Sequence, residues 1–266
     1  MSSVVLKCEG VEDGGEGRLA RRGGAGWGET ARACAAELAG TALLVTLLCL
    51  QAAAEPTARA AGAGATVSLL VHSLGHVSGA QLNPAVTLAA ALRRRQSAAR
   101  AALEVCAQLA GAALGAAALL LLRPALLPPC CTLPAPHLTD ARAVCAEGVC
   151  AGCLVLANLA AWDARRAAHQ DSWPLRLGVA VAALALAAGE LTGASMNPAR
   201  SFGPALLTGN FASHWVYWAG PVLGSLAATV LYGVVWAGPP ACPSLPARRA
   251  ALDTPARCAE ARPLHE

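Results

Sequence analysis

The sequence predicts an all-α membrane protein in which six transmembrane helices and two half-helices form an inverted repeat. Composition is the first reason, because the 266 residues are 56% hydrophobic and only 14% charged, whereas soluble domains carry about 25% charged residues. The second reason is six apolar stretches, each long enough for the ~20 helical residues that a bilayer requires. The third is a motif, Asn-Pro-Ala, that recurs at corresponding places in the two halves of the chain. Its two copies are Asn83, Pro84, Ala85 and Asn197, Pro198, Ala199.

The first half begins with a polar, Gly-rich segment at residues 1–31, which lacks the apolar core of a signal peptide. We expect this segment to be a cytoplasmic tail, so that membrane insertion relies on the first span itself. The apolar segment that begins after Asn83 is too short to cross, and would form a half-helix of ~15 Å at about 84–92. The three spans of this half are expected at about 33–52, 60–77 and 99–122.

The second half repeats this order. Its short segment, at about 198–208, again follows an Asn-Pro pair, and its three spans are expected at about 141–161, 174–190 and 215–236. Residues 239–266 are rich in Pro, Ala and Arg, which favours a disordered cytoplasmic tail. The membrane domain would therefore cover 32–238, with repeat halves at about 32–122 and 140–238.

Each copy of the motif also predicts how its half-helix begins. Asn is a favoured N-cap, and Pro is favoured at the first helical position, where its missing N–H costs nothing. The two copies also match beyond the tripeptide, in residues 75–85 and 189–199. In both segments the Asn is preceded, at equivalent positions, by a Gly, by a Ser or Thr, by the pair Gly-Ala, and by a Leu or Met. A match of this length between the two halves of the chain indicates that they arose from a duplicated unit.

Two carboxylates, Glu37 and Glu147, precede the two asparagines by similar intervals inside the first and fourth spans. A carboxylate in a span is costly and marks either a function or a satisfied internal hydrogen bond. We favour a structural role, because the two copies are symmetric and no chain of Lys, Asp or His accompanies them. The alternative is a proton-carrying group of a coupled transporter, for which Glu104 is the further candidate.

Arginines sort to one side of the predicted membrane domain. They cluster between the first half-helix and the third span, between the fourth and fifth spans, and in both tails, whereas the other loops, near 52–59 and 123–140, carry few cations. Because cytoplasmic loops carry an excess of Lys and Arg, both termini are expected to be cytoplasmic. We favour the plasma membrane over an intracellular membrane for this multi-pass protein. The loop arginines are Arg93, Arg94, Arg95, Arg100, Arg165, Arg166 and Arg176.

With these motifs the chain resembles the aquaporin, or major intrinsic protein, family over roughly residues 30–238. The second half reads like an animal member of that family around Asn197 and from His214 to Pro221. The resemblance implies an aquaporin-like bundle, two half-helices that meet at mid-membrane, and a homotetramer with one pore in each subunit. It also implies that the extended residues before each Asn line the pore with backbone carbonyls. These pore-lining residues would be Gly79, Ala80, Gln81, Gly193 and Ser195.

By the same resemblance, a selectivity filter would be formed by Ala63, Ala185, Ala194 and Arg200. Water-selective members usually have an aromatic residue at the first position and His at the second, whereas this chain has Ala at all three positions beside Arg200. Three small side chains predict a wide, weakly polar constriction. A fixed guanidinium there would repel cations and donate hydrogen bonds to permeants. His76 is expected to lie in the cytoplasmic vestibule.

We therefore expect a passive channel that conducts water and also small neutral solutes such as glycerol or urea, while it excludes ions and protons. One alternative is a structural or adhesive membrane protein that keeps this fold but conducts little, and another is the coupled transporter named above. Nothing in the sequence predicts an enzyme, a metal site, another cofactor or a nucleic-acid partner. The expected partners are the permeants, the lipid bilayer and further copies of the chain.

The chain contains 11 cysteines without the spacing of a metal site. Those on or near the spans, Cys49 among them, are expected to act as small apolar residues. Cys130 and Cys131 are adjacent on an outer loop, where a bond between them would be strained.

Overall fold

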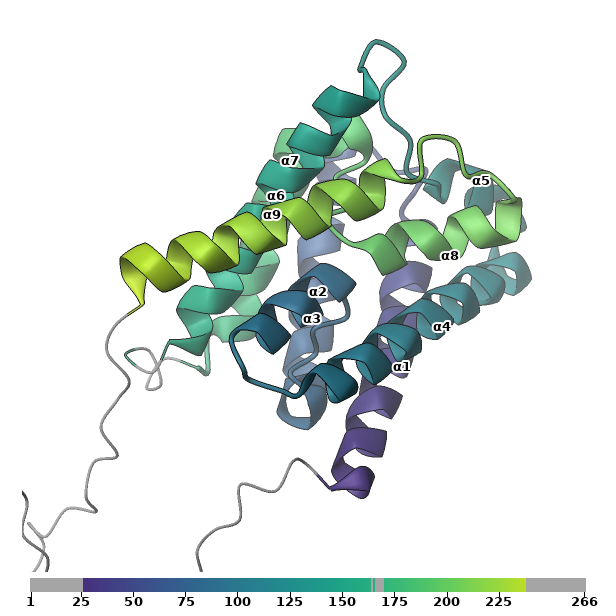
Figure 1. Ribbon diagram of the computed structural model, residues 1–266. Coiled ribbons are helices and arrows are strands. Elements are labelled where there is room, and N and C mark those ends of the chain that lie inside the picture. The colour runs from purple at the N-terminus through teal and green to yellow at the C-terminus, as the bar shows by residue number, and fades with distance from the viewer. Residues whose placement is uncertain (1–25, 164, 166–169, 238–266) are drawn as a thin grey trace, which may run out of the picture.

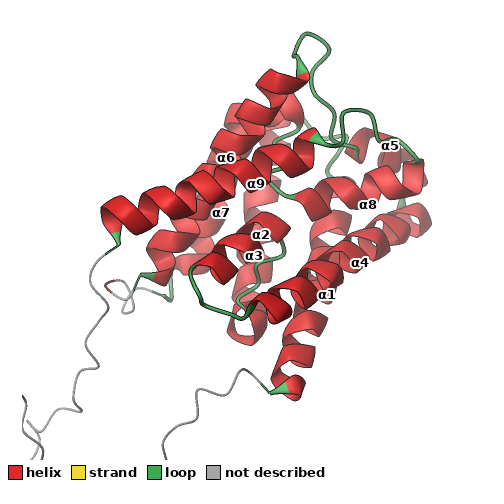
Figure 2. Cartoon of the chain, in the orientation of Figure 1, coloured by secondary structure: helices red, strands yellow, loops and turns green. Residues whose placement is uncertain are grey.

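The computed structural model describes residues 26–163, 165 and 170–237, and within these residues it contains helices, turns and loops but no strand (Figure 2). The described residues form eight longer helices, which are labelled in Figure 1. Three short elements, η1, α5 and η3, complete the described part of the chain. The helices are α1 (Trp27–Leu50), α2 (Pro56–Ser78), α3 (Pro84–Leu92), α4 (Ala98–Leu122), α6 (Asp140–Trp162), α7 (Trp173–Thr192), α8 (Pro198–Thr208) and α9 (Val216–Leu231), with η1 at Pro124–Leu126, α5 at Leu127–Cys130 and η3, a π-helical continuation of α9, at Tyr232–Trp236.

One predicted boundary needs correction. The predicted N-terminal tail included residues 27–31, but α1 already begins at Trp27, where Gly26 precedes it and Glu29 lies in its first turn. An acidic residue there interacts favourably with the positive end of the helix dipole. The remainder of that tail and nearly all of the predicted C-terminal tail lie outside the described residues.

The two half-helices have the bounds that the Asn-Pro motif predicts. α3 begins at Pro84 and α8 at Pro198, and the Asn before each proline is in an extended conformation as the N-cap. α8 ends at Thr208, and its C-cap is Gly209, whose φ of 71° lies in the left-handed region that glycine adopts without strain.

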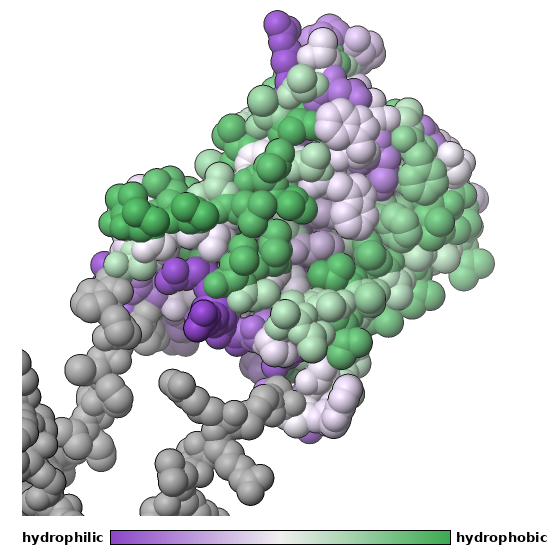
Figure 3. All heavy atoms as spheres, viewed as in Figure 1, coloured by the Kyte–Doolittle hydropathy of each residue, from purple (hydrophilic) through white to green (hydrophobic). Residues whose placement is uncertain are grey.

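Five helices are long and apolar enough to cross a membrane, counted over the described residues: α1, α4, α6, α7 and α9 with its continuation. The sixth predicted span, α2, has 23 residues, which is as long as α6, and it lies within the same bundle. Its Ser, Thr and His side chains between residues 66 and 76 make it less apolar than the others. In Figure 3 apolar side chains cover most of the visible face, and hydrophilic residues gather toward its two ends.

The halves are built from equivalent helix pairs, since α1 packs along α4 and α6 packs along α9. Glycines allow both approaches. A Cβ atom on Gly111 or Gly115 of α4 would overlap backbone of α1, and one on Gly224 of α9 would overlap the carbonyl of Gly148 in α6. Small residues of this kind are typical of close helix contacts in membranes.

The halves are joined by α2 and α7 and by the half-helices. α2 crosses α7 where Gly64 and Gly178 leave no room for a side chain on either helix. Each half-helix packs against a span of the opposite half, α3 on α9 and α8 on α4. At one of these contacts the hydroxyl of Ser225 donates a hydrogen bond of 2.7 Å to the carbonyl of Ala85. This exchange brings the two Asn-Pro-Ala motifs together inside the bundle.

Candidate functional site

The two asparagines of the repeated motif cap their own half-helices. Asn83 Oδ1 accepts a hydrogen bond from the backbone N–H of Ala85 at 2.9 Å. Asn197 Oδ1 accepts from the N–H groups of Ala199 and Arg200 at 3.0 and 3.3 Å. The prolines that follow, Pro84 and Pro198, are buried at the first helical position.

The same two side chains reach across to the opposite half. Asn83 Nδ2 donates to the carbonyl of Met196 at 2.8 Å, and Asn197 Nδ2 donates to the carbonyl of Leu82 at 2.7 Å. A carboxamide nitrogen carries two N–H groups, so one donor on each asparagine remains after this bond. Both asparagines line one cavity between the halves.

Glu37 holds the extended segment before the first motif. Its two oxygens accept hydrogen bonds from the hydroxyl of Ser78 at 2.6 Å and from the backbone N–H groups of Gln81 and Leu82 at 2.9 and 2.6 Å. The side-chain amide of Gln108 adds a fourth donor at 2.7 Å. These contacts explain how a fully buried carboxyl group is tolerated in α1.

Glu147 repeats this arrangement in the second half. It accepts from the hydroxyl of Thr192 at 2.6 Å and from the N–H groups of Ser195 and Met196 at 2.9 and 2.6 Å. The backbone of the two segments repeats as well, with positive φ at equivalent places. These angles are 93°, 44° and 51° at Gly79, Ala80 and Leu82, and 80°, 45° and 54° at Gly193, Ala194 and Met196.

These segments form part of the walls of two adjacent cavities that share some of their lining residues, which we call the inner and the outer cavity. The inner cavity, of about 90 Å³, is bordered by residues 80–83 and 194–197 and otherwise mainly by aliphatic side chains of the spans. The outer cavity is larger, about 440 Å³, and includes Gly193 in its wall. Gly79 ends α2 and is outside the lining of both cavities, among the described residues.

Five residues border both cavities and therefore mark the neck between them. They include all four residues that the resemblance suggested for a filter, together with one from α1 that the sequence analysis missed. The five are Leu48, Ala63, Ala185, Ala194 and Arg200. Nothing in the sequence around Leu48 distinguishes it from the other leucines of its span.

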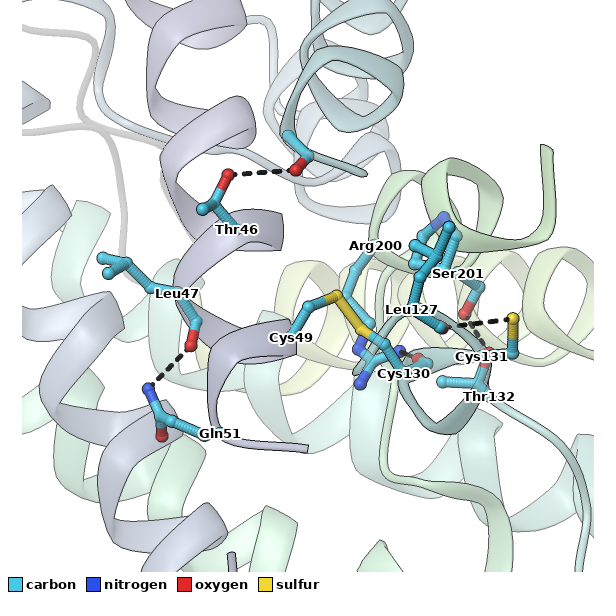
Figure 4. The surroundings of a disulfide bond; sticks show 12 residues. Thr46, Leu47, Cys49, Gln51, Leu127, Cys130, Cys131, Thr132, Arg200 and Ser201 are labelled. Atoms are coloured by element: carbon cyan, nitrogen blue, oxygen red, sulfur yellow. Dashed lines mark hydrogen bonds between the residues drawn. A yellow bond between two sulfur atoms is a disulfide. The ribbon is translucent and has the colours of Figure 1, made fainter. Parts of the chain in front are cut away.

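Arg200 extends from the first turn of α8 toward the connection between α4 and α6. Its Nη1 donates a hydrogen bond of 2.9 Å to the carbonyl of Cys130 in α5 (Figure 4). Cys130 is in turn disulfide-bonded to Cys49 at the C-terminal end of α1. The expectation that Cys49 acts only as a small apolar residue was therefore wrong, and the reason is the packing of α5 on α1, which the sequence does not reveal.

A second polar residue missed by the sequence analysis is Asn158 of α6. Its side chain donates to the carbonyl of Leu154 at 2.9 Å, and the residue borders the inner cavity. Because it stands among aliphatic side chains in a predicted span, only its polarity could have singled it out.

A further group of polar side chains lies near the N-terminal end of α4, away from the disulfide. Gln81 donates to Gln96 at 2.9 Å, and Gln96 donates to Glu104 at 2.7 Å. Glu104 also forms an ion pair of 2.7 Å with Arg100, one turn earlier in α4. His76, predicted for the vestibule, is exposed near the end of α2 and is outside the lining of the two cavities, among the residues described.

Comparison with known proteins identifies one protein family that matches this chain. The Major intrinsic protein family matches residues 27–232. Mouse aquaporin-4 is 38% identical over 188 residues, which cover 70% of this chain and 57% of that protein. Probable aquaporin TIP4-2 of Oryza sativa subsp. japonica is 46% identical over 179 residues, which cover 64% of this chain and 66% of the rice protein. The chain thus spans less than two thirds of the length of either relative.

A third relative and a solved structure agree with this assignment. Human lens fiber major intrinsic protein is 41% identical over 171 residues, which cover 64% of this chain and 65% of that protein. The X-ray structure of the aquaglyceroporin from Plasmodium falciparum superposes with a TM-score of 0.72 and covers 77% of this chain and 96% of that chain. At 21% sequence identity this likeness concerns the fold alone.

Proposed function

Because this integral membrane protein belongs to the major intrinsic protein family, a family of channels rather than enzymes, we propose that it is a passive channel for water and small neutral solutes. The observation that carries the proposal is the neck formed by Ala63, Ala185, Ala194 and Arg200 between two cavities. The two capping asparagines border the inner of these cavities, so one route would pass both features.

Ions would be excluded at the paired motifs. The N-terminus of each half-helix carries roughly half a positive charge. A monovalent cation ~4 Å from both ends would meet a repulsion of about 4 kcal/mol at an effective dielectric constant of 20, in addition to lost hydration. A water that accepts from the free N–H groups of Asn83 and Asn197 would be turned away from a continuous proton relay.

The solute range would follow from the size of the neck. Alanine at positions 63, 185 and 194 provides no bulky or hydrogen-bonding side chain opposite the guanidinium of Arg200. Glycerol and urea are neutral and present hydroxyl or amide groups that Arg200 could bind. We expect both to pass, with Leu48 the bulkiest of the apolar side chains at the neck.

Passive conduction accounts for the buried carboxylates better than coupled transport does. Glu37 and Glu147 accept hydrogen bonds from the pore segments, and Glu104 pairs with Arg100. Among the described residues, none of these three carboxylates borders either cavity. A group that carries protons along a pathway would need access to it.

Reconstitution tests the proposal. Proteoliposomes containing the full chain are shrunk by sucrose, glycerol or urea gradients and compared with empty liposomes by light scattering. Rapid shrinkage in sucrose with fast re-swelling in glycerol and urea is the expected result. Water flux without glycerol entry would contradict the wide neck. Rates equal to those of empty liposomes would instead favour the structural or adhesive protein.

We further propose a homotetramer in the plasma membrane with both termini in the cytoplasm. The arginines near residues 93–100 and at 165 and 176 support this orientation through the positive-inside rule. The disulfide at the opposite end of α1 supports it too, because disulfides persist in oxidising compartments. Cysteine accessibility on either side of the membrane tests the orientation, and native mass spectrometry tests the assembly.

A further inference from the structure

We propose that the Cys49–Cys130 disulfide holds Arg200 against the wall of the neck and thereby keeps the neck open to solutes larger than water. The two cysteines are 81 residues apart in sequence, with Cα atoms 5.1 Å apart, and both are buried. They join the C-terminal end of α1 to α5 (Figure 4). This inference rests on the proposed channel function and adds a positioning role for two residues outside the repeated motifs.

The first step of the argument is that one residue makes both contacts. The side chain of Cys130 is bonded to Cys49, and its backbone carbonyl accepts the hydrogen bond of 2.9 Å from Arg200 Nη1. Among the hydrogen bonds of the described residues, this is the one that the guanidinium makes. The position of the carbonyl, and so of the guanidinium, depends on where α5 is held.

The second step is that no residue of the neck replaces this acceptor in the described part of the chain, because the guanidinium donates its hydrogen bond to Cys130 and none to the neck residues. Its neighbours in the shared lining are Leu48, Ala63, Ala185 and Ala194, whose side chains cannot accept a hydrogen bond. Arg200 is half-buried, and a cation in such a place is destabilised when it loses its hydrogen-bond partner, unless water replaces that partner. If the carbonyl of Cys130 moved away, the guanidinium would regain hydrogen bonds by turning toward water in the passage. In that position it would narrow the passage.

The third step is that loss of the disulfide would displace only the part of the loop near Cys49. Beside Cys130, Thr132 donates a hydrogen bond of 2.7 Å to Ser201, and Ser201 lies 2.6 Å from the hydroxyl of Ser195. These contacts tie the same loop to α8 independently of the disulfide. The loop would therefore stay in place at Thr132 while the part near Cys49 becomes free to shift.

The test compares the glycerol-to-water permeability ratio of wild-type proteoliposomes with that of C49A/C130A and of the two single variants. Alanine suits this apolar site. Because each variant removes the same bond, all three are expected to lower the ratio by roughly the same factor, about threefold or more, with a smaller change in water permeability. The matched control is C106S/C153S, which alters two exposed free cysteines on α4 and α6.

Chemical cleavage of the wild type provides a second measurement if the variants do not fold. A water-soluble phosphine reduces the disulfide in reconstituted protein, so that the S–S bond breaks, two thiols form, and the phosphine takes up oxygen from water as its oxide. Two new thiols counted by mass spectrometry mark complete cleavage. The ratio is then expected to fall as in the variants.

The outcomes separate this inference from the proposed function. A wild type that conducts no more than empty liposomes would overturn the channel proposal and this inference with it. A conducting wild type whose ratio is unchanged or raised after loss of the disulfide would overturn the inference alone and leave the channel intact.

Discussion

Asn83 and Asn197 are bonded reciprocally, because each donates a hydrogen bond to the backbone carbonyl that directly precedes the other. The distances are 2.8 Å from Asn83 Nδ2 to Met196 O and 2.7 Å from Asn197 Nδ2 to Leu82 O. Each asparagine also caps its own half-helix. The N-terminal ends of the two half-helices are therefore joined through the side chains of Asn83 and Asn197, which also line the inner cavity.

Replacement of either asparagine by alanine tests this connection. N83A and N197A each lose a cap and a cross-bond, so each is expected to cost about 1–3 kcal/mol of stability. Because the two bonds link the same pair of segments, the double variant should cost less than the sum. Thermal unfolding measures both. N210A, which removes an exposed cap-like contact to Ala212, is the control, and strict additivity would contradict the reciprocal connection.

Enlarging one alanine of the neck should restrict solutes. Ala185 borders both cavities, and A185F would place a ring beside Arg200. Glycerol permeability is expected to fall by on the order of tenfold while water permeability falls much less, because the larger permeant loses its clearance first. Stopped-flow light scattering gives both rates. The control is A183F, at an exposed position of the same helix; an equal effect there would argue against a neck at Ala185.

Conversion of a buried carboxylate to an amide should loosen the adjacent pore segment. In E147Q one accepting oxygen is replaced by an NH₂ group, which would face a donor such as the N–H of Met196. We expect a loss of about 2–4 kcal/mol, because two buried donors would face each other and each unsatisfied buried polar group costs about 1–3 kcal/mol. E37Q should behave alike. The exposed Glu190 provides the control E190Q, and thermal stability in detergent is the readout.

Close packing of α4 on α1 predicts a strong effect of one methyl group. In G111A the new Cβ would overlap the carbonyl of Leu38, so the helices must separate. Overpacking of this kind typically costs about 1–3 kcal/mol. G28A is the matched control, because no atom lies within 4 Å of a Cβ at that position of α1. Chemical denaturation should show a clear loss of stability in G111A, with G28A neutral or slightly stabilised.

The end of α9 is tied to the loop after α6 by a contact that should persist over a wide pH range. Arg165 donates to Asp163, the Tyr232 hydroxyl donates to Asp163 at 2.9 Å, and Arg165 donates to the carbonyl of Trp236 at 2.7 Å. The hydrogen bonds from Arg165 hold the pKa of Asp163 well below its ordinary value of 3.8. A depressed pKa contributes stability that is present above the ordinary value and lost as pH falls through the folded value.

D163N should therefore lower the thermal stability by the same amount at every pH between about 5 and 8. The difference from wild type should shrink only when the pH falls below the ordinary pKa. Melting temperatures of both proteins across that range check the prediction. D171N, at an exposed aspartate of the same connection, is the control.

The half-helices illustrate how much of this fold could be predicted from local signals. The two residues of an Asn-Pro pair are enough to specify an N-cap and the start of the first helical turn. Both half-helices begin and end at the residues predicted from the sequence. Five of the six spans were located by apolar length, with errors of a few residues except at α1, whose first turn was assigned to the tail. The sixth is present as the helix α2, which is less apolar than the other five. The symmetry of Glu37 and Glu147 predicted a structural role for both, whereas the structure identified the segments before the two motifs as their partners.

Sequence alone determined that this chain is a duplicated helical membrane protein, because apolar length, helix caps and a repeated motif are properties of neighbouring residues. Only the tertiary structure determined that Cys49 is bonded to Cys130, that Leu48 joins the neck and that the two asparagines bond across the halves. Those contacts join residues tens of positions apart. Their formation depends on the distance between the packed helices and on the rotation of each helix about its axis. Small residues such as Gly64 and Gly111 set both, because they allow the helix backbones to come into contact.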